Sequence, residues 1–277
     1  MKQTFQNGVL LLVFILAPLA CQQDQAVRQP EHYLEASALL EKWHQLLLEL
    51  ERFTPGYRPP VTARMWSYVE MAAWQAALPG IPEATDLSVF VNGLPEAQRY
   101  SGQYFLPAGL NAAYAEIFRQ FFPTAPSHLA EKINMLEEEC LRGGGKKVHS
   151  AVLSRSVAYG KKIARDIWVW STTDTIGHEG DQHNYDAQYR SPDGAGCWRP
   201  DGVHHTAALL PYWGMSRSMV VRPSDIGILP PLRYDTRPGT PFHVQAMEVL
   251  AMSKPLTNEY RWLAEFWSDD VPGLTVS

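Results

Sequence analysis

The chain of 277 residues is short of basic residues, of alternating β-branched residues and of long apolar runs. It has 24 Lys and Arg against 29 Asp and Glu, and these basic residues form no stripe along the chain. Because binding to nucleic acid requires such a stripe to neutralise phosphates, we expect no nucleic-acid partner. The missing alternation argues against a substantial sheet. No internal repeat or low-complexity tract is present, and with 45% apolar and 19% charged residues the chain can form a sizeable core.

The longest apolar run lies at the start of the chain, at Val9–Ala20, after the single positive charge of Lys2. Such a run is too short to span a bilayer as a helix but suits the core of a signal peptide. Ala20 followed by Cys21 is typical of a lipoprotein processing site. We therefore predict a signal peptide at 1–20, lipid on Cys21, a tether at 21–32 and anchoring to a membrane surface of the bacterial cell envelope. The alternative is an ordinary secreted leader that is cleaved nearby.

Only two cysteines remain after Cys21, namely Cys140 and Cys197. In an oxidising compartment they can form a disulfide, and otherwise both are plain thiols. Nine Trp and twelve Tyr are many for this length, and they are expected mainly in the core at helix crossings.

Helical periodicity accounts for most of the chain between residues 33 and 170. Apolar residues recur at three- and four-residue steps in five segments, which end or begin at Pro and Gly. The expected helices cover 33–53, 59–78, 107–122, 127–142 and 148–170. Two more are expected near Pro241–Ala251 and Thr257–Trp267. The prediction is therefore an all-α fold, a multi-helix bundle within a domain at 33–277.

Periodicity disappears between about residues 171 and 239, which are rich in Gly, Pro, Asp and His. Irregular segments of this length are uncommon and are usually functional or packed by their own side chains. The segment contains a group with metal-ligand residue types: His178, Glu179, Asp181, His183 and Asp186, with His204 and His205 nearby. The two histidines His178 and His183 are five residues apart, which on a regular helix separates them by about 140°. Zinc on the histidines and calcium on the carboxylates are both conceivable, and the alternative is a solvated polar loop.

Three further groups of charged or aromatic residues each have two possible roles. Lys146, Lys147, Lys161 and Lys162 form either a solvated face or a contact for an anion or a lipid headgroup. Arg222, Arg233 and Arg237 either fix their proline-rich loop through ion pairs or face a pocket supplied by another part of the protein. Trp262, Phe266 and Trp267 are expected to bury against other helices or against a partner segment.

Three segments resemble a known family: the stretch from Trp43 to Gly80, the two parts YGKKIARDIWVW and CWRPDGVHHTAALLPYWG between Tyr159 and Gly214, and RWLAEFWSDD at 261–270. They are similar to the amino-terminal helical half of bacterial vanadium-dependent haloperoxidase-like proteins, in the superfamily of the type 2 phosphatidic acid phosphatases. The resemblance implies that vanadate or phosphate binds in the carboxy-terminal half of an intact relative. It also implies that this chain stops, at Ser277, about where that half begins.

The family's oxyanion pocket has recognisable elements, namely Lys-x6-Arg-Pro, Pro-Ser-Gly-His and Ser-Arg-x5-His-x3-Asp. Its cationic side chains surround the oxyanion, one histidine acts as acid or base, and another bonds the central atom. This chain has none of them: Arg222 and Arg237 precede prolines but lack the Lys, and Ser154–Arg155 and Ser216–Arg217 lack the downstream His and Asp. No catalytic residue is therefore transferred.

The sequence thus predicts the amino-terminal portion of a haloperoxidase-like envelope lipoprotein, inactive alone, with vanadate expected only in the intact relative. Its partner is a missing catalytic half or a second subunit. The family activity is peroxide-dependent halide oxidation or phosphate monoester hydrolysis. A lipid-anchored helical binding or scaffold protein is one alternative, and a metal-dependent hydrolase centred on His178–Asp186 is the other. The first interpretation also predicts an exposed apolar patch on the last helices.

Overall fold

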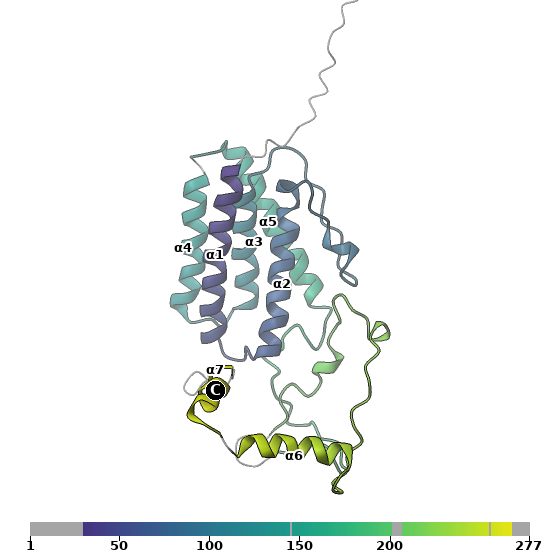
Figure 1. Ribbon diagram of the computed structural model, residues 1–277. Helices are drawn as coiled ribbons and strands as arrows, with labels where there is room; N and C mark the ends of the chain where they lie inside the picture. The colour runs from purple at the N-terminus through teal and green to yellow at the C-terminus, as the bar shows by residue number, and fades with distance from the viewer. Residues whose placement is uncertain (1–29, 145, 201–206, 255, 268–277) are drawn as a thin grey trace, which may run out of the picture.

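The computed structural model describes residues 30–144, 146–200, 207–254 and 256–267 (Figure 1). Its long helices are α1 (Pro30–Phe53), α2 (Pro59–Ala77), α3 (Leu106–Phe121), α4 (Ser127–Gly144), α5 (Ser150–Ser171), α6 (Pro241–Ser253) and α7 (Asn258–Trp267). Short 3-10 turns occur at η1 (Leu78–Gly80), η2 (Leu87–Val89), η3 (Trp213–Met215) and η4 (Pro223–Asp225). The described residues contain no strand, which confirms the predicted all-α class.

The leader, Cys21 and most of the predicted tether lie outside the described residues. The last part of that tether, 30–32, is helical, because α1 already begins at Pro30. The ring of His32 packs edge-on against Phe105 at 5.0 Å. Within the described ranges, no helix is both long enough and apolar enough to cross a membrane.

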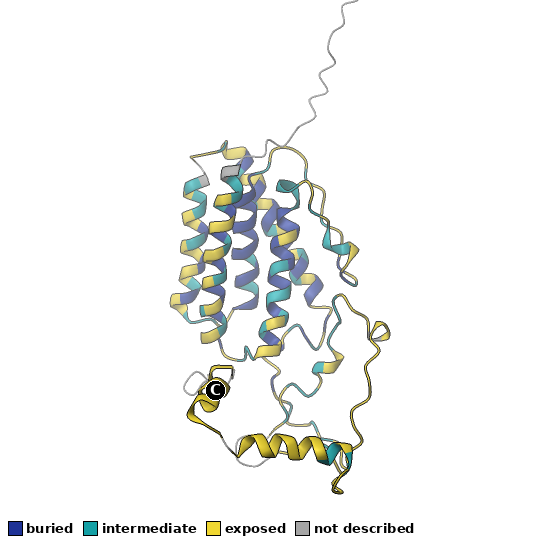
Figure 2. Ribbon diagram, in the orientation of Figure 1, coloured by how far each residue is buried: buried dark blue, intermediate teal, exposed yellow. Residues whose placement is uncertain are grey.

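The five helices α1–α5 form a bundle with α3 at its centre, in contact with each of the other four (Figure 1). Almost every residue of α3 is buried, whereas the outer helices bury only their inward faces (Figure 2). Small residues make this close packing possible. A Cβ at Gly160 of α5 would lie 2.1 Å from the carbonyl oxygen of Gly109 in α3, so these two backbones touch only because Gly160 has no side chain.

Aromatic rings fill the bundle core, as the composition predicts. Trp43 of α1 is fully buried, stacks on Tyr114 and packs edge-on against Phe118. Its indole N–H donates to the Asn111 side-chain oxygen at 3.1 Å, and Asn111 donates to the Glu137 carbonyl at 2.9 Å. Every buried polar group in this chain of contacts thus has a partner, so the core keeps its hydrogen bonds in a dry environment.

The turn between α1 and α2 joins the bundle to the irregular segment. Gly56 has a φ of +91° there, and a Cβ on it would lie 1.9 Å from the carbonyl oxygen of Asp181. The side chain of Asn184 donates to the carbonyl oxygens of Gly56 at 2.8 Å and of Asp181 at 3.0 Å. Glycine is therefore needed both for the backbone conformation and for the close approach.

The irregular segment from 171 to 239 has two parts. The residues just before Val220 are held by the stretch that precedes α3: Asn92 donates its backbone N–H to the Met219 carbonyl at 2.7 Å and its side chain to the Ser218 carbonyl. The part after Val220 is mostly exposed and leads to α6, which lies beyond the end of the bundle (Figures 1 and 2). Asn92, which lies outside the segment, therefore holds residues 218 and 219, and contacts within the segment add to this, since the Leu210 N–H donates to the Asn184 carbonyl at 2.7 Å.

Candidate functional site

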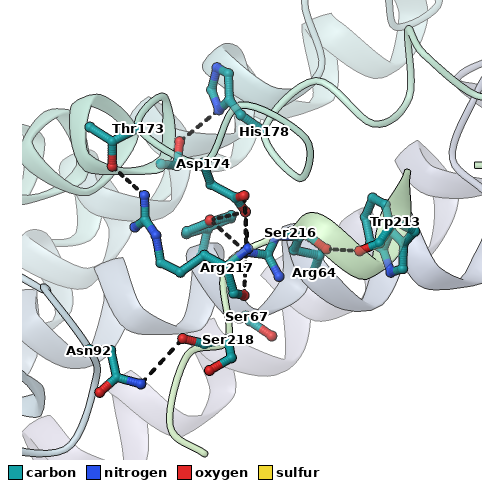
Figure 3. A network of polar contacts seen from close by, with 12 residues as sticks. Arg64, Ser67, Asn92, Thr173, Asp174, His178, Trp213, Ser216, Arg217 and Ser218 are labelled. Carbon is teal, nitrogen blue, oxygen red and sulfur yellow. Dashed lines mark hydrogen bonds and ion pairs between the residues drawn. The ribbon is translucent and has the colours of Figure 1, made fainter. Parts of the chain in front are cut away.

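A buried ionic cluster lies at the end of α5 (Figure 3). Asp174, three residues beyond α5, is 3% exposed and forms an ion pair with Arg64 of α2. It also accepts from the hydroxyl of Tyr68 at 3.2 Å and from the backbone N–H of Arg217 at 3.0 Å. Arg64 in turn donates to the Arg217 carbonyl at 2.8 Å. One carboxylate thus joins α2, the end of α5 and a loop more than forty residues further along the chain.

The second arginine of the cluster is held by α5. The guanidinium of Arg217 lies 4.3 Å from the ring centre of Trp170, a cation–π geometry. It donates to the Trp170 carbonyl at 3.3 Å and to the Thr173 hydroxyl. Arg64 is packed as tightly, because a Cβ at Gly177 would lie 2.0 Å from its Nε. Burial raises the pKa of Tyr68 to about 12, so its hydroxyl remains a proton donor to Asp174.

The arrangement of this cluster is structural rather than catalytic. The Asp174 carboxylate accepts from three groups of this chain, which occupy most of its roughly four acceptor positions. Two donors, Arg64 Nε and Arg217 Nη1, are buried without a partner. Arg64 Nε faces the Gly177 backbone, which leaves no room for an anion, and the Asp174 carboxylate would repel one. This cluster therefore does not fit vanadate or phosphate.

Sequence reasoning did not identify this cluster. Ser216–Arg217 matches only the start of a family motif whose downstream His and Asp are absent, and Arg64 and Asp174 belong to no motif. A weak signal does exist, because Arg64 and Tyr68 are four residues apart on one face of α2 and Asp174 follows directly on the longest predicted apolar stripe. Their meeting with Arg217 depends on the path of the irregular segment, for which no periodic pattern gives information.

The predicted metal-ligand group does not come together in the structure. His178 contacts Ser171 Oγ at 2.9 Å and packs edge-on against Trp168 at 4.5 Å, and burial lowers its pKa. His183 lies 3.8 Å from Glu179 on the surface. Burial raises the pKa of Asp181. Asp186 accepts the backbone N–H of Gln188 at 2.7 Å.

These side chains thus serve separate local contacts. Among the residues that the structure describes, no three His, Cys, Asp or Glu side chains are arranged to hold a metal ion. His204 and His205 lie outside the described residues. The geometry therefore gives no support to the metal-dependent hydrolase alternative.

The lysines form ion pairs with neighbouring carboxylates. Lys147 bonds Glu35 at 2.7 Å and Lys162 bonds Asp166 at 2.6 Å, both on the surface. Lys161 lies 2.9 Å from the buried carboxylate of Glu137. No side-chain contact of Lys146 is seen within the described ranges. This pattern fits the solvated-face interpretation better than an anion site, because most of the positive charge is already paired.

The arginines of the proline-rich loop pair only with their near neighbours in sequence. Arg237 bonds Asp235 at 2.5 Å, and Arg222 lies 3.8 Å from Asp225. Arg233 is exposed. The first two therefore stabilise local turns, as one interpretation of the sequence predicts.

The two remaining cysteines are free thiols in the structure. Cys140 lies in α4, where its thiol contacts the Pro107 carbonyl at 3.8 Å, and burial raises its pKa to about 12. Cys197 lies in the irregular segment. Of the two sequence-based alternatives, the structure contains the unpaired one.

The last two helices expose an apolar surface (Figure 2). Neither α6 nor α7 contains a buried residue. We define the C-terminal apolar surface as their exposed large apolar side chains: Val244, Met247, Val249, Leu250, Met252, Tyr260, Trp262, Leu263, Phe266 and Trp267. Trp267 is 80% exposed. The expectation that Trp262, Phe266 and Trp267 bury against other helices of the chain is therefore wrong, and the expected exposed patch is present.

The composition of α6 sharpens this observation. Its apolar residues are distributed around the whole helix, interrupted by few polar ones such as His243, Gln245 and Glu248. A helix that is apolar all round is normally buried on every side. In α7, by contrast, Trp262, Leu263, Phe266 and Trp267 share one face.

Comparison with known proteins shows similarity at the level of the fold. No protein-family model matches the chain, and no curated protein matches it. Among solved structures, a bacterial vanadium-dependent iodoperoxidase is similar, with a TM-score of 0.60 and 19% sequence identity. The match covers 84% of this chain and 55% of that one. The chain therefore has a haloperoxidase-like helical fold, and it spans about half the length of the iodoperoxidase that it matches.

Proposed function

We propose that this chain provides the non-catalytic helical half of a vanadium-haloperoxidase-type enzyme. The observation that carries the proposal is the fold similarity, which involves most of this chain but only 55% of the iodoperoxidase. The C-terminal apolar surface supports it, because α6, which is apolar all round, and the apolar face of α7 both lie exposed. The remaining part of such a fold is the partner that would cover them.

The chemistry is assigned to that other part of the fold. The cluster around Asp174 offers no cradle for an oxyanion, since Arg64 and Arg217 are held by Asp174, Thr173 and backbone carbonyls and the carboxylate would repel an anion. We therefore derive no reaction step within this chain and place no vanadate in it. In the complete enzyme, vanadate would catalyse halide oxidation by peroxide, or its site would serve phosphate ester hydrolysis.

The proposal is tested first on the gene. The coding DNA beyond the codon for Ser277, and the adjacent genes, are read for Lys-x6-Arg-Pro and Ser-Gly-His. The chain alone and the chain together with the encoded remainder are then assayed with orthovanadate, peroxide and iodide by triiodide absorbance. We expect activity only with the remainder. Absence of both motifs, or iodide oxidation by residues 1–277 alone, would overturn the proposal.

We also propose that the mature chain begins at lipidated Cys21 and is anchored in the bacterial envelope. The support is the sequence pattern at Ala17–Cys21. Growth with a labelled fatty acid should label the wild-type chain and not the Cys21→Ser variant, which should also leave the membrane fraction. Equal labelling of both would contradict lipidation at this residue.

A lipid-anchored helical binding protein is the second candidate. It is favoured by the continuous apolar core of the bundle and by a cavity beside α5. A monomeric, fully folded chain with unrelated DNA downstream would support this candidate over the first.

A further inference from the structure

A β-turn between η2 and α3 contains the dipeptide Asn92–Gly93. The Leu94 N–H donates to the Val91 carbonyl at 3.2 Å, which places Asn92 and Gly93 at the two central positions of the turn. Gly93 has a φ of +73°, a conformation that glycine adopts readily at the second central position. Gly93 is exposed, and its N–H makes no hydrogen bond within the part of the chain that the structure describes. No protein group therefore engages this nitrogen.

Asn92 holds three consecutive residues of the irregular segment. Its backbone N–H donates to the Met219 carbonyl at 2.7 Å. Its side-chain amide donates to the carbonyl oxygens of Ser218, at 3.3 Å, and of Val220, at 3.4 Å (Figure 3). Both side-chain distances lie beyond the usual range for an N–H donor, so they hold the amide only weakly. The side chain can therefore leave these carbonyls without a large loss of free energy.

Asparagine is one of the chemically labile residues, and a following glycine increases this lability. The backbone nitrogen after an asparagine can attack the side-chain amide carbon, and glycine offers no side chain that hinders the approach. Among the described asparagines, only Asn92 precedes a glycine. Asn111 and Asn134 lie inside α3 and α4, where the helix fixes the backbone that such an attack must rearrange.

We propose that Asn92 is a site of spontaneous deamidation and that the modification releases residues 218–220 from the turn. The Gly93 nitrogen loses its proton to base in solution and forms a bond to Cγ of Asn92, and the side-chain nitrogen leaves as ammonia. Water then opens the cyclic imide at either of its two carbonyl carbons, which yields aspartate or isoaspartate. The net reaction consumes one water and needs no oxidant or reductant. It is independent of the proposed function.

The product cannot make the contacts of the amide. A carboxylate at position 92 has no proton to donate, and it would face the carbonyl oxygens of Ser218 and Val220, which repel it. Isoaspartate also adds a carbon atom to the main chain, which displaces the N–H that Met219 accepts. The segment would then be held near this point mainly by Arg217, through Asp174 and α5.

The modification is tested by ageing the full chain in mildly alkaline buffer, because base removes the Gly93 proton. Trypsin then releases the peptide Met65–Arg99, in which Asn92 is the only asparagine. Mass spectrometry should show conversion of this amide to acid, in separable aspartate and isoaspartate forms, while Asn134 and Asn184 stay intact. An unchanged Asn92, or equal conversion of all three asparagines, would overturn the proposal.

The release is tested by brief trypsin digestion of the folded chain. Cleavage after Arg217 requires this side chain to leave Trp170 and Thr173. Asn92→Asp should be cut there about fivefold faster than wild type or more, as the loss of a single hydrogen bond predicts. The aged wild-type chain should show the same acceleration, which guards against a folding defect of the variant.

The matched control is Asn134→Asp on the exposed face of α4. It makes the same chemical change but keeps the oxygen that accepts from Arg119 at 2.7 Å. It should be cut after Arg217 at the wild-type rate. A wild-type rate for both Asn92→Asp and the aged chain would overturn the proposed release, and so would equal acceleration in the two variants.

Discussion

Single residues with buried charge hold the irregular segment to the bundle. Asp174 accepts from α2 through Arg64 and Tyr68 and from the distant loop through Arg217. The side chains of Arg64 and Asp174 are only 11% and 2% exposed, so neither charge can be hydrated if the other is lost. A buried pair of this kind adds little net free energy when it is intact, but breaking it is costly because it leaves an uncompensated charge.

Replacement of Asp174 by Asn should therefore destabilise the chain strongly. The change keeps the shape but leaves the Arg64 guanidinium buried without a counter-charge, at a cost of roughly 3 kcal/mol in the free energy of unfolding. Urea denaturation followed by circular dichroism measures this. Asp193→Asn, at an exposed loop position, is the control and should change the unfolding free energy little. Equal stability of both variants would show that Asp174 does not anchor the segment.

Glu137 should make the free energy of unfolding depend on pH in the acidic range. Burial alone raises its pKa, but hydrogen bonds from Arg119 and Lys161, together with their charges, outweigh burial and hold the pKa below its usual value. A carboxyl whose pKa is lower in the folded state stabilises fully above its unfolded pKa of about 4.3. That contribution is lost as the pH falls through the folded pKa.

Glu137→Gln should therefore flatten the acid side of the stability profile. Unfolding free energies between neutral pH and pH 3 should converge for wild type and variant as the pH falls, because protonated Glu137 resembles Gln. Glu138→Gln, which changes an exposed neighbour, is the control and should follow the wild type. Parallel curves for wild type and Glu137→Gln would refute the assignment.

At the scale of elements, close contact between α3 and α5 sets the geometry of the bundle. Gly160 and Gly109 bring the two backbones together, and Tyr104 fills the space beside Gly109, where a Cβ would lie 1.7 Å from its hydroxyl. The Tyr104 hydroxyl donates to the Ala76 carbonyl of α2 at 2.5 Å. Positions without side chains therefore decide how three helices meet.

Gly160→Ala should force α3 and α5 apart. The new methyl group would meet the backbone oxygen of Gly109, which cannot rotate away as a flexible side chain can. Overpacking of this kind lowers the free energy of unfolding by about 1–3 kcal/mol. The higher helix propensity of alanine over glycine stabilises by less than this. Thermal unfolding should show a lower midpoint than wild type. Gly143→Ala in α4, where nothing lies within 4 Å, should not lower it, and equal midpoints would contradict the close contact.

At the scale of the whole molecule, the bundle and the last two helices differ in how far their apolar residues are buried. The bundle α1–α5 buries its apolar faces within itself, whereas α6 and α7 bury none of their residues. Large contiguous apolar surfaces on soluble proteins mark sites of association. The isolated chain should therefore associate through the C-terminal apolar surface.

Replacing Trp262, Phe266 and Trp267 together by Gln should suppress this association. Sedimentation velocity over a range of concentrations should show larger species for wild type and fewer for the variant, with less binding of a hydrophobic dye. The unfolding midpoint of the bundle should not change, because these side chains do not contribute to its core. The matched control replaces Leu34, Phe90 and Met135, which are exposed but scattered. Association that persists in the first triple variant would locate the contact elsewhere.

The sequence by itself determined the helices of this protein. Stripes of apolar residues with helical period, ended by Thr54–Pro55–Gly56, Pro79–Gly80 and the glycines after Arg142, located each long helix to within a few residues, because period and helix-breaking residues act locally. It also indicated the family resemblance, and the structure confirms the haloperoxidase-like fold. The lipid anchor at Cys21 remains a prediction.

Only the tertiary structure decided which polar residues meet. The Arg64–Asp174–Arg217 cluster joins positions far apart along an aperiodic segment, and the cavity at Trp170 depends on how the stretch 93–97 lies over α5. The His178–Asp186 group shows the converse, since residues close in sequence make separate local contacts: His178 with Ser171, His183 with Glu179, and Asp186 with Gln188. The exposed state of α6 and α7 was also decided at this level, because burial depends on the surfaces that a fold supplies and not on the hydrophobicity of the helix alone.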